Sequence, residues 1–149
     1  RRLCAVRLLL VGTPGYFDQH GRPTHPRELA HHRGFHYSNT RSGTAWRFVH
    51  ARHGEYAQSV PAIMHANNAE VFEPVLRAGL GLAVQPEFLV WDALRDGTLE
   101  TVMEDWQVPA LELSVITPPG LHRPTRVQAL IDYLATALEA PPWIAREMA

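Results

Sequence analysis

The residues best suited to chemistry are two adjacent asparagines, Asn67 and Asn68, at the predicted start of a helix. Asn68 can accept a hydrogen bond from the first free backbone amides, and Glu70 adds negative charge where the helix dipole favours it. Two side-chain amides supply both donors and acceptors, and free N–H groups at a helix start favour an anionic or carbonyl-bearing ligand. Simple capping by Asn68, with Asn67 solvated, is the alternative, and the two roles are compatible.

No catalytic set accompanies these asparagines. None of the serines lies in a Gly-x-Ser-x-Gly turn, the context that exposes a nucleophilic serine. Glu104 and Asp105 are adjacent rather than arranged around a shared substrate. All 14 basic residues are arginines, so chemistry that requires a lysine is excluded. We therefore expect the chain not to be an enzyme.

Nine histidines raise the possibility of a metal site. The densest group is His31, His32 and His36, with His20 and His25 nearby. His31 and His32 would point in different directions from a helix, and the step to His36 does not restore one face. No Cys or clustered carboxylate completes a tetrahedral ligand set. Solvated loop histidines are favoured over a zinc site, and we expect no metal and no cofactor.

Composition sets the outer limits on function. The chain has 149 residues, of which 46% are apolar and 19% charged, which excludes a disordered protein. Its net charge of -1 provides no net electrostatic attraction for the phosphate groups of nucleic acid. The single Cys4 excludes an internal disulfide. The sequence shows no membrane span or signal peptide, so we expect a cytoplasmic protein; the chain starts without Met, which suggests a piece of a longer one.

The elements that would position the asparagines alternate between strands and helices, which indicates an α/β architecture. Predicted strands cover residues 7–12, 34–38, 46–50, 55–65, 80–85, 99–103 and 111–117, and predicted helices cover residues 13–17, 25–32, 67–79, 86–95 and 124–139. A turn near residues 52–54 should join 46–50 and 55–65 into a hairpin.

Three residues should shape the segment that follows Asn68. Pro74 removes a backbone hydrogen bond and should kink the predicted helix 67–79. Gly79 suits a left-handed helix cap, and Gly81 allows a close backbone approach before a buried strand.

The order of short motifs resembles the effector-binding domain of LysR-type transcriptional regulators. The matching pieces, in the family's order, are Leu-Leu-Leu-Val-Gly-Thr-Pro-Gly-Tyr-Phe (8–17), Pro-Arg-Glu-Leu-Ala-His-His-Arg (26–33), Trp46-x-Phe48, Ala-Asn-Asn-Ala-Glu (66–70), Ala-Gly-Leu-Gly-Leu-Ala-Val-Gln-Pro-Glu-Phe-Leu (78–89), Gly-Thr-Leu-Glu (97–100) and Leu-Ser-Val-Ile-Thr-Pro-Pro (113–119). The likeness then continues into the long predicted helix and covers nearly the whole chain.

This resemblance implies an α/β, periplasmic-binding-protein-like (type II) fold with two lobes around a small-molecule cleft. Residues 1–32 would end the first lobe, 33–106 would form the second lobe, and 107–139 would return to the first, with 140–149 a flexible tail. On this mapping the opening part of the first lobe is missing, together with one wall of the cleft.

The resemblance also implies where the effector binds and which partners the protein has. Asn67 and Asn68 match the helix start that contacts the effector in this family. Tyr37 and Ser38, with Thr40 nearby, would point into or near the cleft, or form an ordinary surface loop. Thr13 and Thr117 end first-lobe strands near the crossover between lobes, where hinge duty or strand-end capping also explains them.

The expected function is effector sensing and oligomerisation within such a regulator, with self-association as a dimer or tetramer. DNA would be bound only by an N-terminal helix-turn-helix domain that this sequence does not contain, and no membrane partner is expected. The alternative is a solute-binding protein of a transport system with the same lobed fold. A small α/β enzyme is the third possibility, which the missing catalytic set disfavours.

Overall fold

The structure is a computed structural model that describes residues 1–39, 43–118, 124–139, 141 and 143. Thr40 and most of the predicted tail lie outside the described residues. The chain divides into two compact units, one of residues 7–109 and the other of residues 1–6 with 110–149. The predicted lobe boundaries after residues 32 and 106 stay a prediction.

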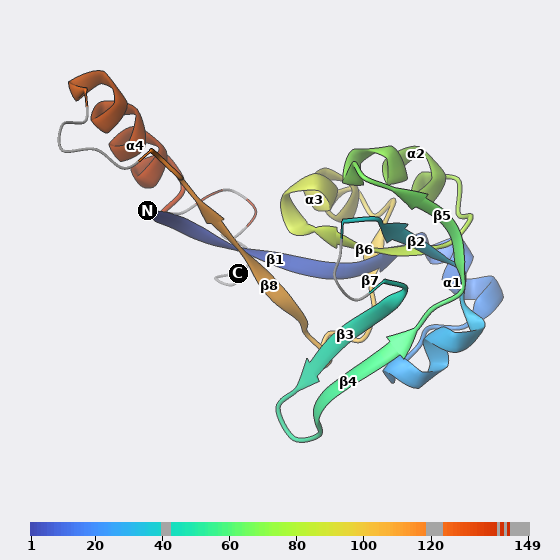
Figure 1. Cartoon of the computed structure of the whole chain (residues 1–149). Helices are drawn as coiled ribbons and strands as arrows, with labels where there is room; N and C mark the ends of the chain where they lie inside the picture. Colours follow the sequence, from blue (N-terminus) through green and yellow to red (C-terminus); the bar gives the residue numbers. More distant parts are fainter. Residues whose placement is uncertain (40–42, 119–123, 140, 142, 144–149) are drawn as a thin grey trace. The chain divides into compact units, whose positions relative to one another are not determined.

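The larger unit is built on a mixed sheet with the strand order β5-β2-β6-β1-β7 (Figure 1). The strands are β1 (Arg2–Gly12), β2 (Gly34–Tyr37), β5 (Ala62–Ala66), β6 (Leu82–Pro86) and β7 (Glu100–Thr101). Strand β2 lies between β5 and β6 and is parallel to both, whereas β1 is antiparallel to β6 and β7. A separate antiparallel hairpin joins β3 (Ala45–His50) to β4 (Gly54–Ser59), as predicted.

Both faces of the sheet are covered by a hydrophobic core. Successive side chains of a strand point to opposite faces, so neighbouring residues enter different cores. Leu10 and Leu82 belong to one core, and the next residues, Val11 and Ala83, belong to the other. The first core collects side chains from helix α1 (Pro14–His20), the 3-10 helix η1 (Pro26–His31) and β3. The second collects side chains from α2 (Phe72–Arg77) and α3 (Glu87–Arg95), which lie beside β6 in Figure 1.

The short helices of the first core begin where the sequence predicts. The hydroxyl of Thr13 accepts a hydrogen bond from the backbone N–H of Tyr16 at 3.1 Å, and Pro14 follows as the first helical residue. Gly21 ends α1 with a φ of 88°. The predicted helix 25–32 is present as the 3-10 helix η1, which His25 caps through its ring nitrogen.

The single strand predicted for residues 55–65 is wrong. Its two parts are β4, which pairs with β3, and β5, which joins the main sheet beside β2. Val60 and Pro61 separate them; Val60 is buried in the first core, and Pro61 has no N–H for a ladder. The carbonyl of Pro61 instead accepts a hydrogen bond from the N–H of Gly34 at 2.8 Å, which starts the pairing of β2 with β5.

The continuous helix predicted for residues 67–79 is also wrong. A 3-10 turn, η2 (Ala69–Val71), comes first, and α2 starts only at Phe72. Pro74 is therefore the third residue of α2, where the missing N–H would have no helical partner in any case, so α2 itself needs no kink. Gly79 ends the segment with a φ of 67°, which confirms the predicted left-handed cap.

The later elements deviate less from prediction. Helix α3 begins at Glu87, with Pro86 as the preceding cap residue rather than the first helical one. The predicted strand 99–103 is reduced to the two residues of β7, and the predicted strand 111–117 is β8 (Val108–Ser114). The long C-terminal helix is confirmed as α4 (Thr125–Ala137).

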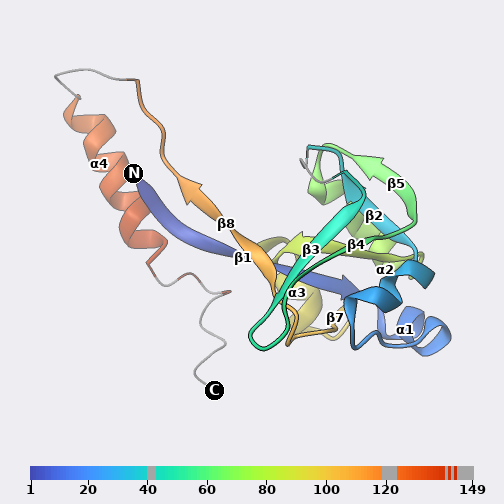
Figure 2. The ribbon, with the colours of Figure 1, turned by 60° about the horizontal axis from the view of Figure 1, so that its bottom comes forward.

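The smaller unit contains the start of β1, most of β8 and helix α4. Strands β1 and β8 are hydrogen-bonded neighbours and run side by side in Figures 1 and 2. The backbones of Arg1 and Val115 exchange two hydrogen bonds of 2.8 Å each. Helix α4 buries Ile131, whereas Leu130 and Tyr133 are 57% and 69% exposed. None of the helices in the described residues is long and apolar enough to cross a membrane.

Replacement of Gly81 by Ala should destabilise the larger unit. An added Cβ would lie 2.6 Å from the carbonyl oxygen of Arg33, which accepts the 2.9 Å hydrogen bond from Leu82 that aligns β2 with β6. We expect a loss of about 1–3 kcal/mol of unfolding free energy in denaturant titrations. Gly15→Ala is the matched control, because a Cβ there meets open space in a helix and should be neutral or stabilising. Equal effects of the two substitutions would contradict this packing.

Candidate functional site

The candidate site lies where β2 and β5 end. These strands are parallel neighbours with Tyr37 opposite Ala66, and the N–H of Ser38 donates to the carbonyl of Ala66 at 2.7 Å. Tyr37 and Ser38 therefore leave the sheet beside Asn67 and Asn68, and we call these four residues the β2–β5 edge. Open α/β sheets bind ligands outside the carboxyl ends of their parallel strands, so this is the edge of the sheet expected to carry a ligand.

The side chains at the β2–β5 edge are exposed and polar. The Oδ1 atom of Asn68 accepts a hydrogen bond from the N–H of Glu70 at 3.1 Å, which confirms the predicted cap. Asn67 is exposed, and its side chain makes no hydrogen bond to another described residue. The Nδ2 atom of Asn39 donates to the hydroxyl of Tyr37 at 3.4 Å. The edge thus presents a free amide, a second amide fixed by capping and two hydroxyl groups.

A buried histidine lies directly before the β2–β5 edge in strand β2. His36 immediately precedes Tyr37, is 1% exposed, and its ring centre lies 4.9 Å from that of Trp46 and 5.6 Å from that of His65. Burial lowers the pKa of His36, the nearby His65 lowers it further, and the backbone of Val60 opposes the shift. A neutral imidazole therefore lies beneath the edge at physiological pH.

Sequence reasoning missed the polar residues at the end of the third parallel strand, β6. Glu87 is 2% exposed and accepts two hydrogen bonds from Arg7, at 2.9 and 2.7 Å. The buried Gln85 donates from Nε2 to the carbonyl of Ala69 at 3.3 Å, which joins β6 to the turn after Asn68. The only available signal was the placement of polar residues at the borders of apolar runs, which does not reveal that Arg7 and Glu87 meet.

The other two candidate residues are not part of the β2–β5 edge. Thr13 follows the end of β1, which pairs with the beginning of β6, so it lies at the opposite edge of the sheet. Its hydroxyl caps helix α1. Thr117 belongs to the smaller unit, where it follows β8 and is half-buried. Whether any of the six candidates contacts an effector stays a prediction.

The histidines do not gather into a metal site in the part of the chain that the structure describes, where no three or more His, Cys, Asp or Glu side chains are placed to hold an ion. His31 is exposed, but His32 and His36 are buried, so the expectation of solvated loop histidines is wrong for these two. A ring nitrogen of His32 lies 3.3 Å from the hydroxyl of Tyr16.

Comparison with known proteins shows the family. The family model described as the LysR substrate binding domain matches residues 1–139, and the chain belongs to this family. Its relatives are described as transcriptional regulators. They include the probable HTH-type transcriptional regulator LtrA of Klebsiella pneumoniae, 28% identical with 93% of this chain and 45% of that protein covered. The HTH-type transcriptional regulator PtxR of Pseudomonas aeruginosa is 30% identical, with 95% of this chain and 45% of that protein covered.

Solved structures show the same fold. The full-length virulence activator AphB of Vibrio cholerae gives a TM-score of 0.80 at 24% identity, over 93% of this chain and 47% of that one. The regulatory domain of CrgA from Neisseria meningitidis gives a TM-score of 0.67 at 20% identity, over 93% of this chain and 67% of that one. The fold is therefore α/β and periplasmic-binding-protein-like (type II), as predicted. The chain spans about half the length of the curated relatives that it matches.

The stability of the chain should fall as the pH is lowered below about 6.5. Burial lowers the pKa of His32, with the charges of His20 and His31 adding to the shift and Glu28 opposing it, and His36 is lowered in the same direction. For both residues the unfolded chain binds a proton more readily than the folded chain. Their stabilising contribution is therefore complete above the unfolded pKa of 6.5 and is lost as the pH falls below it.

Denaturant titrations between pH 7.5 and pH 5 measure this dependence. In the variant His36→Gln, which does not titrate, the decrease in unfolding free energy should be shallower than in the wild type. His53→Gln is the control, because His53 is exposed in the turn between β3 and β4. A wild-type stability that is flat across this range would contradict the buried, neutral state of His36.

Proposed function

We propose that this chain is the effector-sensing part of a LysR-type transcriptional regulator, which binds a small molecule and thereby controls how the full-length protein holds DNA. The observation that carries this proposal is the β2–β5 edge. Two parallel strands end together there and place Tyr37 and Ser38 beside Asn67 and Asn68. The family membership supports the same function.

The proposed effector carries a carboxylate or a carbonyl group. Asn67 offers an N–H₂ donor and a carbonyl acceptor, and Ser38 offers a hydroxyl that can do either. The helix dipole contributes less than the sequence predicts, because the segment after Asn68 is a three-residue 3-10 turn followed by the six-residue α2. Recognition therefore depends on the side-chain amides and hydroxyls of the edge.

In the proposed regulator, DNA is bound by a separate helix-turn-helix domain, because the net charge of -1 on this chain provides no attraction for phosphate groups. The relatives are transcriptional regulators, which favours this function over the alternative of a solute-binding protein for transport, and over an enzyme. The chain itself would then sense the ligand without catalysis.

Self-association is the second part of the proposed function. The smaller unit exposes several large apolar side chains, which association with a second copy would remove from water. The exposed members are Leu111, Leu113, Ile116, Leu130 and Tyr133. A symmetric dimer is the commonest closed arrangement for such a surface.

Replacement of Asn67 by Ala tests the effector site. It should weaken the effector response of the full-length regulator by about 1 kcal/mol, roughly a fivefold rise in the effector concentration at half response, because one hydrogen bond to the ligand is lost. The fold should be unaffected, because Asn68 provides the cap. The readout is a reporter assay over a range of effector concentrations, with thermal unfolding as the check on folding.

Ser38→Ala should weaken the same response, because Ser38 lies on the neighbouring strand end. Ser114→Ala is the matched control, because Ser114 is an exposed residue of β8 and not one of the candidate site residues. Normal dose–response curves for both Asn67→Ala and Ser38→Ala would mean that the edge faces solvent only.

Tyr133→Glu tests the proposed association surface. Tyr133 is 69% exposed on α4, so a charge there should leave the helix intact but oppose burial against a second copy. Sedimentation velocity should show a dimer for the wild type and a shift towards monomer for Tyr133→Glu, with Tyr133→Phe behaving as wild type. A wild-type chain that stays monomeric at high concentration would contradict self-association through this surface.

A further inference from the structure

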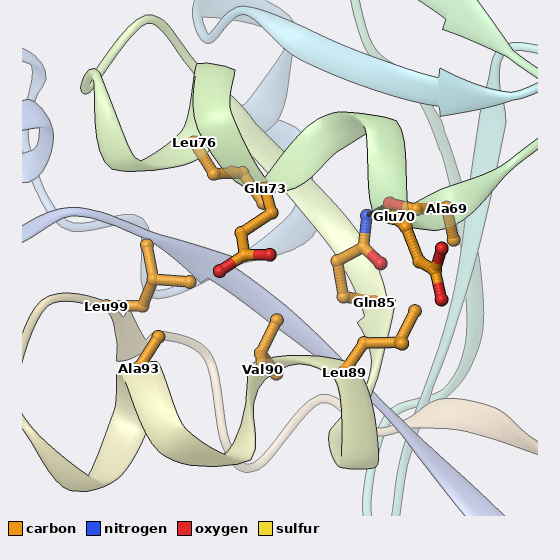
Figure 3. A pocket seen from close by; sticks show the side chains of 9 residues that line it. All are labelled: Ala69, Glu70, Glu73, Leu76, Gln85, Leu89, Val90, Ala93 and Leu99. Atoms are coloured by element: carbon orange, nitrogen blue, oxygen red, sulfur yellow. Dashed lines mark hydrogen bonds between the residues drawn. The ribbon is translucent and has the colours of Figure 1, made fainter.

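A small cavity separates α2 from α3 on one face of the sheet (Figure 3). Its volume of about 30 Å³ is large enough to hold a water molecule or an ammonium-sized group. Its lining residues come from η2, α2, β6 and α3 and the residues after α3: Ala69, Glu70, Glu73, Leu76, Gln85, Leu89, Val90, Ala93 and Leu99. We call it the α2–α3 pocket. It includes none of the residues of the β2–β5 edge, so it is a separate site.

The pocket contains a buried hydrogen-bond acceptor without a partner. Gln85 is 2% exposed, and its Oε1 atom makes no hydrogen bond within the described part of the chain. Its Nε2 atom donates to the carbonyl of Ala69. The opposite orientation of the amide would place two oxygen atoms against each other, so the free atom is the acceptor. A buried polar atom without a partner is unfavourable, and a hydrogen-bond donor in the pocket would satisfy it.

Two carboxylates stand at the same pocket. Figure 3 shows the side chains of Glu73, from α2, and Gln85, from β6, lining the same pocket, with the Gln85 oxygen turned towards Glu70 in this view. One oxygen of Glu73 accepts a hydrogen bond from Arg77 at 3.0 Å, and the other oxygen accepts none from the described residues. Glu70 adds a second negative charge at the rim. The polar side chains of the pocket therefore favour a group that donates hydrogen bonds and carries positive charge.

The remaining wall is apolar. Leu76, Val90 and Leu99 are at most 4% exposed and line the side of the pocket that faces the second core. Such a wall suits a methyl or methylene group attached to the donor and offers no hydrogen bonds to a larger polar ligand.

We propose that the α2–α3 pocket binds a protonated amine group, either free ammonium or the –NH₃⁺ group of a small ligand. The amine donates to Oε1 of Gln85 and to the carboxylate of Glu73, and its charge is compensated by Glu73 and Glu70. An occupant without N–H donors leaves Gln85 unsatisfied, so a quaternary amine does not bind.

The test is a titration of the isotope-labelled chain with methylammonium chloride, followed by NMR at constant ionic strength. Saturable shifts are expected for the side-chain amide of Gln85 and for the backbone amides of residues 69–77. Ammonium chloride is the second probe, and tetramethylammonium chloride and sodium chloride are the controls. Saturation by ammonium alone assigns the site to the free ion, and saturation by both probes assigns it to an amine head group.

Two variants test the residues that hold the amine. Glu73→Gln and Gln85→Leu should each weaken binding about tenfold, because each removes one hydrogen bond to a charged group. Glu55→Gln is the matched control for charge, since Glu55 is an exposed residue of the β3–β4 hairpin. If Gln85→Leu unfolds, Glu73→Gln still decides the result. The proposal is overturned if neither probe saturates the site, which would mean a structural water only, or if the control salts give the same shifts.

Discussion

Strand β2 and its two parallel neighbours, β5 and β6, determine where the residues of the candidate site lie. The close approach of Gly81 to the carbonyl of Arg33 allows Leu82 to pair with β2, and this contact aligns β6. On its other side β2 pairs with β5 up to Tyr37 and Ala66. Because the three strands run in the same direction, the residues that follow them meet at one edge. A shift of one residue would turn every side chain of β2 to the opposite face.

Much of this arrangement can be predicted from the sequence where local chemistry decides. The cap by Asn68, the cap by Thr13 and the left-handed Gly79 all follow from side-chain or backbone properties within a few residues, and all are present. The order of motifs also identified the family and the fold. Local sequence patterns do not predict the structure where the pairing of strands distant in the sequence determines it. Residues 55–65 have the pattern of one strand, but β4 and β5 belong to different sheets.

The buried polar residues explain why the candidate site was only partly predicted. His36, Gln85 and Glu87 read as ordinary polar positions in the sequence, yet each is at most 2% exposed. Their roles depend on partners far along the chain: Arg7 for Glu87, Ala69 for Gln85, and Trp46 and His65 for His36. The order of strands in the sheet brings these distant residues together, and the local sequence pattern does not determine that order. His36 immediately precedes the β2–β5 edge, whereas Gln85 lines the α2–α3 pocket, so these buried polar residues lie near the ends of the parallel strands of the larger unit.

The central claim is that the β2–β5 edge contacts the effector. The most direct measurement is a crystal structure of the full-length regulator grown with a small molecule that changes its output in a reporter assay. Ligand density is expected within hydrogen-bond distance of Asn67, with Ser38 or Tyr37 on the neighbouring strand end as a further contact. Density that lies elsewhere and touches none of the four edge residues would contradict it.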